Sequence, residues 1–106
     1  MADRLARQPP GRTGKVASVQ SALRPQEADT WTIALYGQSQ SEVAVIGEGA
    51  TNLDLTVADE AGQPVCADLS ASDIALCAFA PARNGYFTVT VRNAGTLPGR
   101  YTLLTD

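Results

Sequence analysis

Hydrophobic and polar residues alternate along much of the chain, most clearly between residues 53 and 58. Leu53, Leu55 and Val57 are separated there by single polar or small residues. A period of two places the apolar side chains on one face of a strand and the others on the opposite face. Turn-forming residues follow at 59–62. The pattern predicts a half-buried strand that ends in a tight turn, with Asp54 on its outward face.

Similar segments recur on both sides of this strand and are separated by glycine, proline and asparagine. The predicted strands cover residues 30–35, 42–46, 63–68, 73–80, 86–92 and 100–105. Gly47-Glu48-Gly49 is expected to break the strand over residues 42–46. Residues 16–23 fit a helix through Val16, Val19 and Leu23 or a strand through Val19, Ser21 and Leu23, and the β-rich context favours the strand.

Seven or eight short strands without a convincing helix predict an all-β, antiparallel sandwich, because strand edges must be paired or covered. Tyr101 and Leu103 are expected to point inward. Tyr86 and Tyr101 could be exposed binding aromatics, but core or half-buried positions are the preferred interpretation. The predicted core between the two sheets consists of Trp31, Ile33, Leu35, Leu53, Leu55, Val57, Phe87, Val89 and Val91.

The length and composition indicate a single globular domain. The chain has 106 residues, of which 44% are hydrophobic and 18% charged. No apolar run is long enough to span a membrane. Pro9-Pro10-Gly11 interrupts helix and sheet alike, so residues 1–14 are interpreted as a basic, irregular tail or linker and residues 15–106 as the sandwich domain.

Charge is distributed unevenly along the chain. Residues 1–24 contain five basic residues against Asp3 alone, a net charge of +4, whereas residues 25–106 contain three arginines against ten acids, a net charge of −7. A basic arm can bind nucleic acid or anionic lipid, but these charges are dilute and have no aromatic companions. We therefore expect no nucleic-acid partner, and expect the arm to pair with a sheet edge, either its own or a neighbour's.

Cys66 and Cys77 are the only cysteines. If residues 64–79 form a hairpin that turns at Ala71-Ser72, these two residues face each other with Cα atoms about 4.5 Å apart. That distance lies within the disulfide range of about 4.4–6.8 Å. A disulfide predicts an oxidising compartment. Because no signal peptide precedes the domain, the chain is either an excised piece of a longer precursor or a protein with reduced thiols, and the first is preferred.

The chain contains no histidine. Histidine is the commonest general base and metal ligand, and the usual serine and cysteine triads require it. Lys15 is the only lysine and lies near the tail. We therefore expect the protein not to be an enzyme.

A set of short motifs occurs in one order along the chain. The motifs are Asp29-x-Trp31-x-Ile33-x-Leu35, Gly37-Gln38, Val43-x-Val45, Asn52-Leu53-Asp54-Leu55-x-Val57-x-Asp59-x-x-Gly62, Cys66-x-Asp68, Cys77-x-Phe79-x-Pro81, Gly85-Tyr86-x-x-Val89-x-Val91-x-Asn93 and Gly99-Arg100-Tyr101-Thr102-Leu103. This ordered set resembles the bacterial pre-peptidase C-terminal (PPC) domain over residues 15–105.

The resemblance implies a jelly-roll-like sandwich that is secreted, extracellular or periplasmic and has no catalytic activity. Some relatives bind calcium or fibrous substrates. Calcium prefers six to eight oxygen ligands. The family often has an aspartate at the position of Asn52, so the substitution removes one charge from such a site. The candidate calcium ligands are Glu48, Asn52, Asp54, Asp59 and Asp68; the alternative is a solvated acidic rim.

Two functions follow from these expectations. The first is a secreted accessory module that binds or positions an extracellular polymer, such as a polysaccharide, or a partner protein. The second is a structural subunit that self-associates through residues 1–24, by pairing its arm with the sheet of a neighbour.

Overall fold

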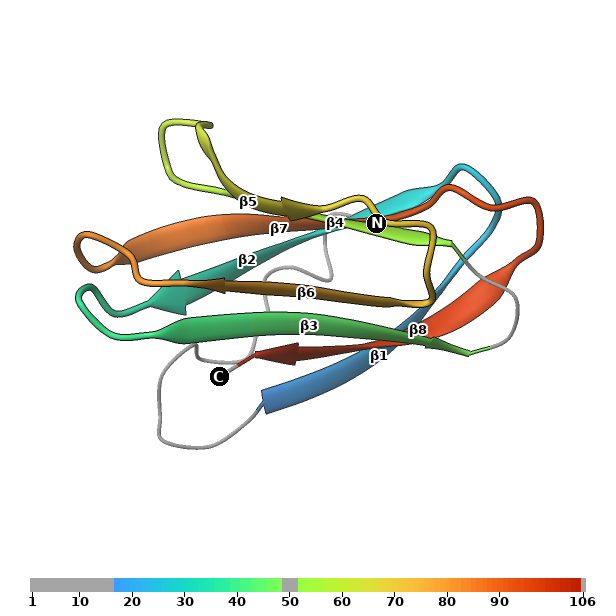
Figure 1. Ribbon diagram of the computed structural model, residues 1–106, viewed down its shortest axis with the longest axis horizontal. Coiled ribbons are helices and arrows are strands. Elements are labelled where there is room, and N and C mark those ends of the chain that lie inside the picture. The colour runs from blue at the N-terminus through green and yellow to red at the C-terminus, as the bar shows by residue number, and fades with distance from the viewer. Residues whose placement is uncertain (1–16, 49–51, 106) are drawn as a thin grey trace.

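A computed structural model describes residues 17–48 and 52–105, which form eight β-strands (Figure 1). In the described part of the chain no helix is long and apolar enough to cross a membrane. The strands are β1 (Ala17–Leu23), β2 (Ala28–Leu35), β3 (Ser41–Glu48), β4 (Leu53–Ala58), β5 (Pro64–Asp68), β6 (Ile74–Phe79), β7 (Gly85–Asn93) and β8 (Gly99–Thr105).

The strands form two four-stranded antiparallel sheets. One has the order β1-β8-β3-β6 and the other the order β2-β7-β4-β5. Every connection between consecutive strands crosses from one sheet to the other except that from β4 to β5, which are neighbours in one sheet. This is the topology of an eight-stranded jelly roll. The predicted fold class, an all-β jelly-roll-like sandwich, is confirmed.

The core lies between the two sheets and is built from the alternating positions that the sequence indicates. The pattern of β4 is regular, with Leu53, Leu55 and Val57 buried and the residues between them half-buried. All nine predicted core residues are buried, as are Tyr101 and Leu103. Tyr86 is 60% exposed. The preferred interpretation of Tyr86 is therefore wrong: it precedes the buried Phe87 on β7, and strand alternation directs it outward.

Residues 17–23 form a strand and not a helix, and they pair with β8 of the same chain from Ala17↔Thr105 to Leu23↔Gly99. The sheet edge that this segment joins is thus the molecule's own. β3 continues through Glu48, two residues beyond the predicted end at Ile46. Residues 1–14, interpreted as a tail, lie outside the described residues.

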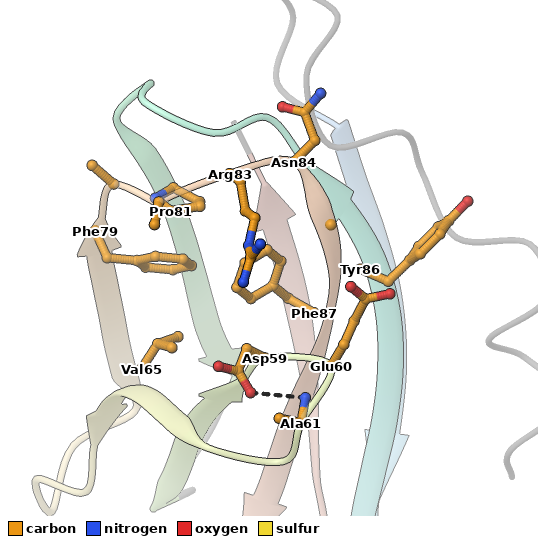
Figure 2. Close-up of a pocket in the computed structure, with 13 residues that line it drawn as sticks. Asp59, Glu60, Ala61, Val65, Phe79, Pro81, Arg83, Asn84, Tyr86 and Phe87 are labelled. Carbon is orange, nitrogen blue, oxygen red and sulfur yellow. Dashed lines mark hydrogen bonds between the residues drawn. The ribbon is translucent and has the colours of Figure 1, made fainter.

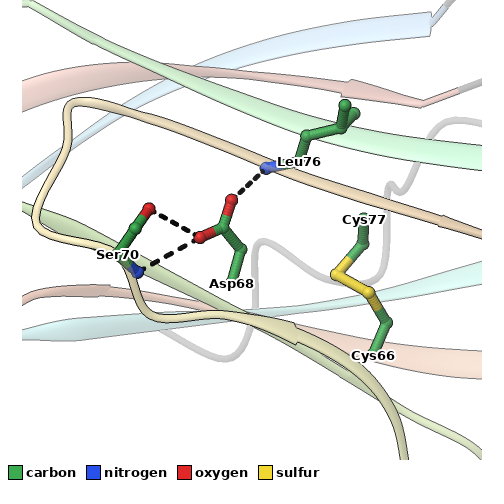
Figure 3. Close-up of a disulfide and its surroundings, with 5 residues drawn as sticks. All are labelled: Cys66, Asp68, Ser70, Leu76 and Cys77. Carbon is green, nitrogen blue, oxygen red and sulfur yellow. Dashed lines mark hydrogen bonds between the residues drawn. A yellow bond between two sulfur atoms is a disulfide. The ribbon is translucent and has the colours of Figure 1, made fainter.

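The predicted Cys66–Cys77 disulfide is present, with Cα atoms 5.9 Å apart. The hairpin used to predict it is wrong. β5 pairs with β4, where Cys66 is opposite Val57, and β6 pairs with β3, where Cys77 is opposite Val43. The segment between β5 and β6 crosses from one sheet to the other, so the disulfide joins the edge strands of the two sheets (Figure 3).

Candidate functional site

The turns that follow β2, β4 and β6 meet at one end of the sandwich, called here the pocket end (left in Figure 1). Gly37 of the first turn lies directly against the third, since a Cβ atom on Gly37 would be 2.2 Å from the Arg83 Cα. The Gly37 N–H donates to Asn84 Oδ1 at 2.7 Å and the Gln38 N–H donates to the Pro81 carbonyl at 2.7 Å. A residue larger than glycine would separate these two turns.

The turn between β4 and β5 is held by Asp59. Its Oδ1 accepts hydrogen bonds from the N–H groups of Ala61 at 3.0 Å and Gln63 at 2.9 Å, and its carbonyl accepts one from the Gly62 N–H at 2.9 Å. Gly62 has φ +84°, a conformation that favours glycine. Asp59, a candidate calcium ligand, therefore uses part of its carboxylate to organise its own turn.

A pocket of about 580 Å³ opens between the second and third turns (Figure 2). Its apolar wall comes from Val65, Phe79, Pro81 and Phe87, and the rings of Phe79 and Phe87 pack with centroids 5.8 Å apart. This wall joins both sheets, because Phe79 is on β6 and Phe87 is on β7.

Charged side chains lie beside the apolar wall. Figure 2 shows Arg83 extending into the pocket next to the Phe87 ring, whereas Tyr86 points away from Phe79 and Phe87. Within the described ranges, the Arg83 side chain makes no hydrogen bond and no ion pair with Asp59 or Glu60. The pocket thus presents a cation and carboxylates that do not neutralise each other by direct contact.

Asp68 has a structural role at the edge of the sandwich (Figure 3). Its Oδ1 accepts hydrogen bonds from the Ser70 hydroxyl at 2.7 Å and the Ser70 N–H at 3.1 Å, and its Oδ2 accepts one from the Leu76 N–H at 2.9 Å. These bonds, first that from the Ser70 hydroxyl, lower the pKa of Asp68. The carboxylate covers an N–H of edge strand β6 from the opposite sheet, which protects that edge from intermolecular pairing.

The five candidate calcium ligands are spread over the molecule. Asp54 is opposite Arg92 in the β4–β7 register, and Glu48 is opposite Arg100 in the β3–β8 register. Asn52 precedes β4, and its buried Oδ1 has no hydrogen-bond partner among the residues that the structure describes. Among the residues that the structure describes, no three acidic, cysteine or histidine side chains are grouped as a metal site would require. Calcium binding stays a prediction from the resemblance.

A buried polar network lies on the opposite side of the sandwich from the disulfide and was missed by the sequence reasoning. Asp29, 1% exposed, accepts hydrogen bonds at Oδ2 from the Ser21 hydroxyl at 2.8 Å and the Tyr101 hydroxyl at 2.7 Å. The Trp31 indole N–H donates to the Tyr101 hydroxyl at 2.9 Å. Burial, and then the bond to Asp29, raise the pKa of Tyr101. The network connects β1 and β8 of one sheet with β2 of the other.

Comparison with known proteins shows which fold the chain shares with solved structures but assigns it to no protein family. No protein-family model matches the chain, and no curated protein matches it. Among solved structures, the pre-peptidase C-terminal domain of a collagenase from Bacillus anthracis superposes with a TM-score of 0.73 at 14% identity, covering 93% of this chain and 96% of that one. The chain has a PPC-like fold.

A second solved structure shares the architecture less closely. PliG of Aeromonas hydrophila, a periplasmic inhibitor of g-type lysozyme, superposes with a TM-score of 0.57 at 14% identity, covering 92% of each chain. At 14% identity both likenesses show a shared fold and no shared function.

Proposed function

We propose that this chain is a non-catalytic module that works outside the cytoplasm and binds an extracellular polymer or a partner protein through its pocket end. The observation that carries the proposal is the open pocket of about 580 Å³, in which Arg83 and Glu60 lie beside an apolar wall and form no ion pair with each other within the described residues. Concave sites with an apolar lining and a few convergent polar groups are typical of ligand binding.

The chemistry of the pocket supports binding and not catalysis. The described residues that line it include no serine, cysteine or lysine that could act as a nucleophile, and the sequence contains no histidine that could serve as a base. Asp59 is engaged by the amides of its own turn. What remains is a set of donors, acceptors and aromatic rings that can recognise a ligand.

Two observations support a location outside the cytoplasm. The Cys66–Cys77 disulfide ties the two sheets together, and disulfides persist in oxidising compartments. One protein of similar fold is named as periplasmic, and the other is a domain of a collagenase. Cys66 is half-buried and Cys77 is buried, so folding in a reducing compartment would leave two unpaired thiols between the sheets.

Sedimentation with insoluble polymers tests the proposal. The purified chain would be mixed with peptidoglycan sacculi, chitin or collagen fibrils, and in parallel assayed as an inhibitor of g-type lysozyme. We expect one of these partners to retain the wild-type chain, and a Tyr86→Ala, Arg83→Gln double variant to lose that binding. Arg92→Gln is the matched control, because Arg92 is exposed at the far end of β7. Equal retention of the double variant and the control would exclude the pocket end as the binding surface.

A further inference from the structure

We propose that the outer face of strands β3 and β6 is a second interaction surface, which binds an amphipathic helix of a partner protein. The helix carries basic residues beside its apolar ones. The surface, called here the β3–β6 face, is separate from the pocket end. It consists of the outward side chains of the two strands: Glu42, Ala44, Ile46, Glu48, Ile74, Leu76 and Ala78.

Large apolar side chains are adjacent on the β3–β6 face. Ile46 is opposite Ile74 in the register of the two strands. Leu76 is opposite Ala44, next to this pair on the same face. Opposite side chains have Cβ atoms about 4.5–5.5 Å apart, and diagonal ones are within reach of long side chains. Ile46, Ile74 and Leu76 are 41%, 56% and 52% exposed, so they form one continuous apolar area in contact with solvent.

The outer face of the other sheet has the ordinary composition. Antiparallel sheets with one solvated face usually carry polar residues on that face. The sheet β2-β7-β4-β5 does so, with half-buried threonines at outward positions of its strands: Thr30, Thr32, Thr56, Thr88 and Thr90. The β3–β6 face departs from this pattern, although threonine would suit its strands equally well. Adjacent exposed apolar residues mark interaction surfaces, whereas single ones need no explanation.

The free edge of β6 is closed to strand pairing at two positions. The Leu76 N–H donates to Asp68 Oδ2 at 2.9 Å, and the Ile74 N–H donates to Ser72 Oγ at 3.1 Å. Figure 3 shows the Leu76 side chain directed away from the disulfide while its N–H is bonded to Asp68. A partner therefore meets the side chains of the β3–β6 face and not an open row of backbone groups.

A helix is the element that suits such a surface. Its backbone N–H and C=O groups are bonded within the helix, so it can cover an apolar area without leaving peptide groups unpaired. An extended segment on the same face would bury peptide groups that have no partners. A helix packed on a sheet is also one of the layer arrangements that bury an apolar face.

Acidic residues select a basic helix. Glu42 and Glu48 are exposed on β3, on either side of Ile46, and six residues of strand separate them by about 20 Å. Neither β3 nor β6 contains a basic residue; Arg100 is opposite Glu48 on the other neighbour of β3, strand β8. A second copy of the chain would bring the same acids together across a twofold axis, whereas basic side chains beside an apolar stripe complement them.

Chemical-shift titration of the ¹⁵N-labelled chain tests the inference with synthetic peptides of about 18 residues, long enough as helices to span both glutamates. The first peptide has leucine at i, i+3, i+4 and i+7, lysine beside this stripe and alanine elsewhere. The second has glutamate in place of lysine, and the third has the composition of the first without a stripe. We expect the first to shift the amides of residues 44–46 and 74–76 with a dissociation constant of about 0.1–1 mM. The other two should bind at least about tenfold more weakly.

Matched variants connect the shifts to the β3–β6 face. Leu76→Thr should weaken binding of the first peptide at least about tenfold. Leu97→Thr should leave binding unchanged, because Leu97 is 51% exposed in the loop between β7 and β8. Glu42→Gln should weaken binding about threefold, whereas Asp54→Asn, on the outer face of the other sheet, should not.

Full affinity in Leu76→Thr, or equal binding of the peptide without a stripe, would overturn the inference. Shifts confined to residues 60–61 and 83–86 would also overturn it, because the peptide would then occupy the pocket end. Self-association of the wild type that Leu76→Thr abolishes, measured by sedimentation velocity, would show a second copy on this face in place of a partner's helix. The proposed function is tested through variants of the pocket end, so the two can fail independently.

Discussion

The buried network around Asp29 gives the most specific prediction for stability, through the substitution Tyr101→Phe. This change removes one hydroxyl and almost no volume, so packing is preserved. The hydroxyl makes two bonds, one to the Asp29 carboxylate at 2.7 Å and one from the Trp31 indole N–H at 2.9 Å. A hydrogen bond to a charged group contributes about 1.5–3 kcal/mol and a neutral one about 1 kcal/mol. Loss of both should lower the free energy of unfolding by about 2–4 kcal/mol.

The assay is urea unfolding followed by the fluorescence of Trp31, the only tryptophan, which is 3% exposed. Tyr86→Phe is the matched control and should change stability by less than about 0.5 kcal/mol, because its hydroxyl is on an exposed side chain. A loss below about 0.5 kcal/mol for Tyr101→Phe would refute the network as a stabilising connection between the sheets.

The same tyrosine predicts a pH dependence. The folded-state pKa of Tyr101 is raised above the ordinary value of 10.0. The folded chain therefore holds the hydroxyl proton of Tyr101 more tightly than the unfolded chain does. The contribution of this proton to the free energy of unfolding is complete below pH 10 and is lost as the pH rises further. Stability of the wild type should therefore decline more steeply above about pH 10 than that of Tyr101→Phe. Parallel alkaline profiles of the two proteins would contradict the assignment.

Three further predictions concern the sheets and their edges. Reduction of Cys66–Cys77, or its replacement by alanines, should lower stability by about 2–3 kcal/mol for so short a loop, and intact mass before and after reduction reports the bond; two free thiols in unreduced, secreted protein would argue against it. Leu55→Ala should cost about 2–5 kcal/mol, because Leu55 is fully buried on a central strand; a loss under about 0.5 kcal/mol in urea melts would mean that its face is misassigned. Asp68→Asn should make stability depend less on pH under acidic conditions. The pKa of Asp68 is lowered in the folded chain, so the stabilisation by its carboxylate is present above the unfolded pKa of 3.8 and is lost as the pH falls through the lower folded pKa. Identical acidic stability profiles of the variant and the wild type would exclude this role.

Alternation with a period of two made the strands, their inward faces and the core predictable. It also carried information that the sequence reasoning did not use. Asp29 shares its face with Trp31, Ile33 and Leu35, so the same alternation places this aspartate in the core, where a buried carboxylate requires partners. Tyr86 is outward by the same rule, because Phe87 follows it.

Strand pairing and the pocket could not be predicted in this way. Alternation defines the face on which a residue lies but not the strand beside it, so a hairpin and a crossing between sheets look alike over residues 64–79. Residues 69–73 contain no strong two-residue hairpin signal. The pocket depends on three turns that are far apart in the sequence, and the contact of Gly37 with the Arg83 backbone exists only in the folded chain.

The central claim is that the pocket end is the binding surface of the PPC-like fold, and filling the pocket tests it most directly. Ala82 is exposed and lines the pocket, whereas Ala67 is exposed on β5 and does not line it. Ala82→Trp and Ala67→Trp add the same side chain at these two positions. With the polymer or protein that retains the wild type, we predict that Ala67→Trp binds normally and that Ala82→Trp, shown to be folded by urea unfolding followed by circular dichroism, does not. Undiminished binding by Ala82→Trp would contradict the account.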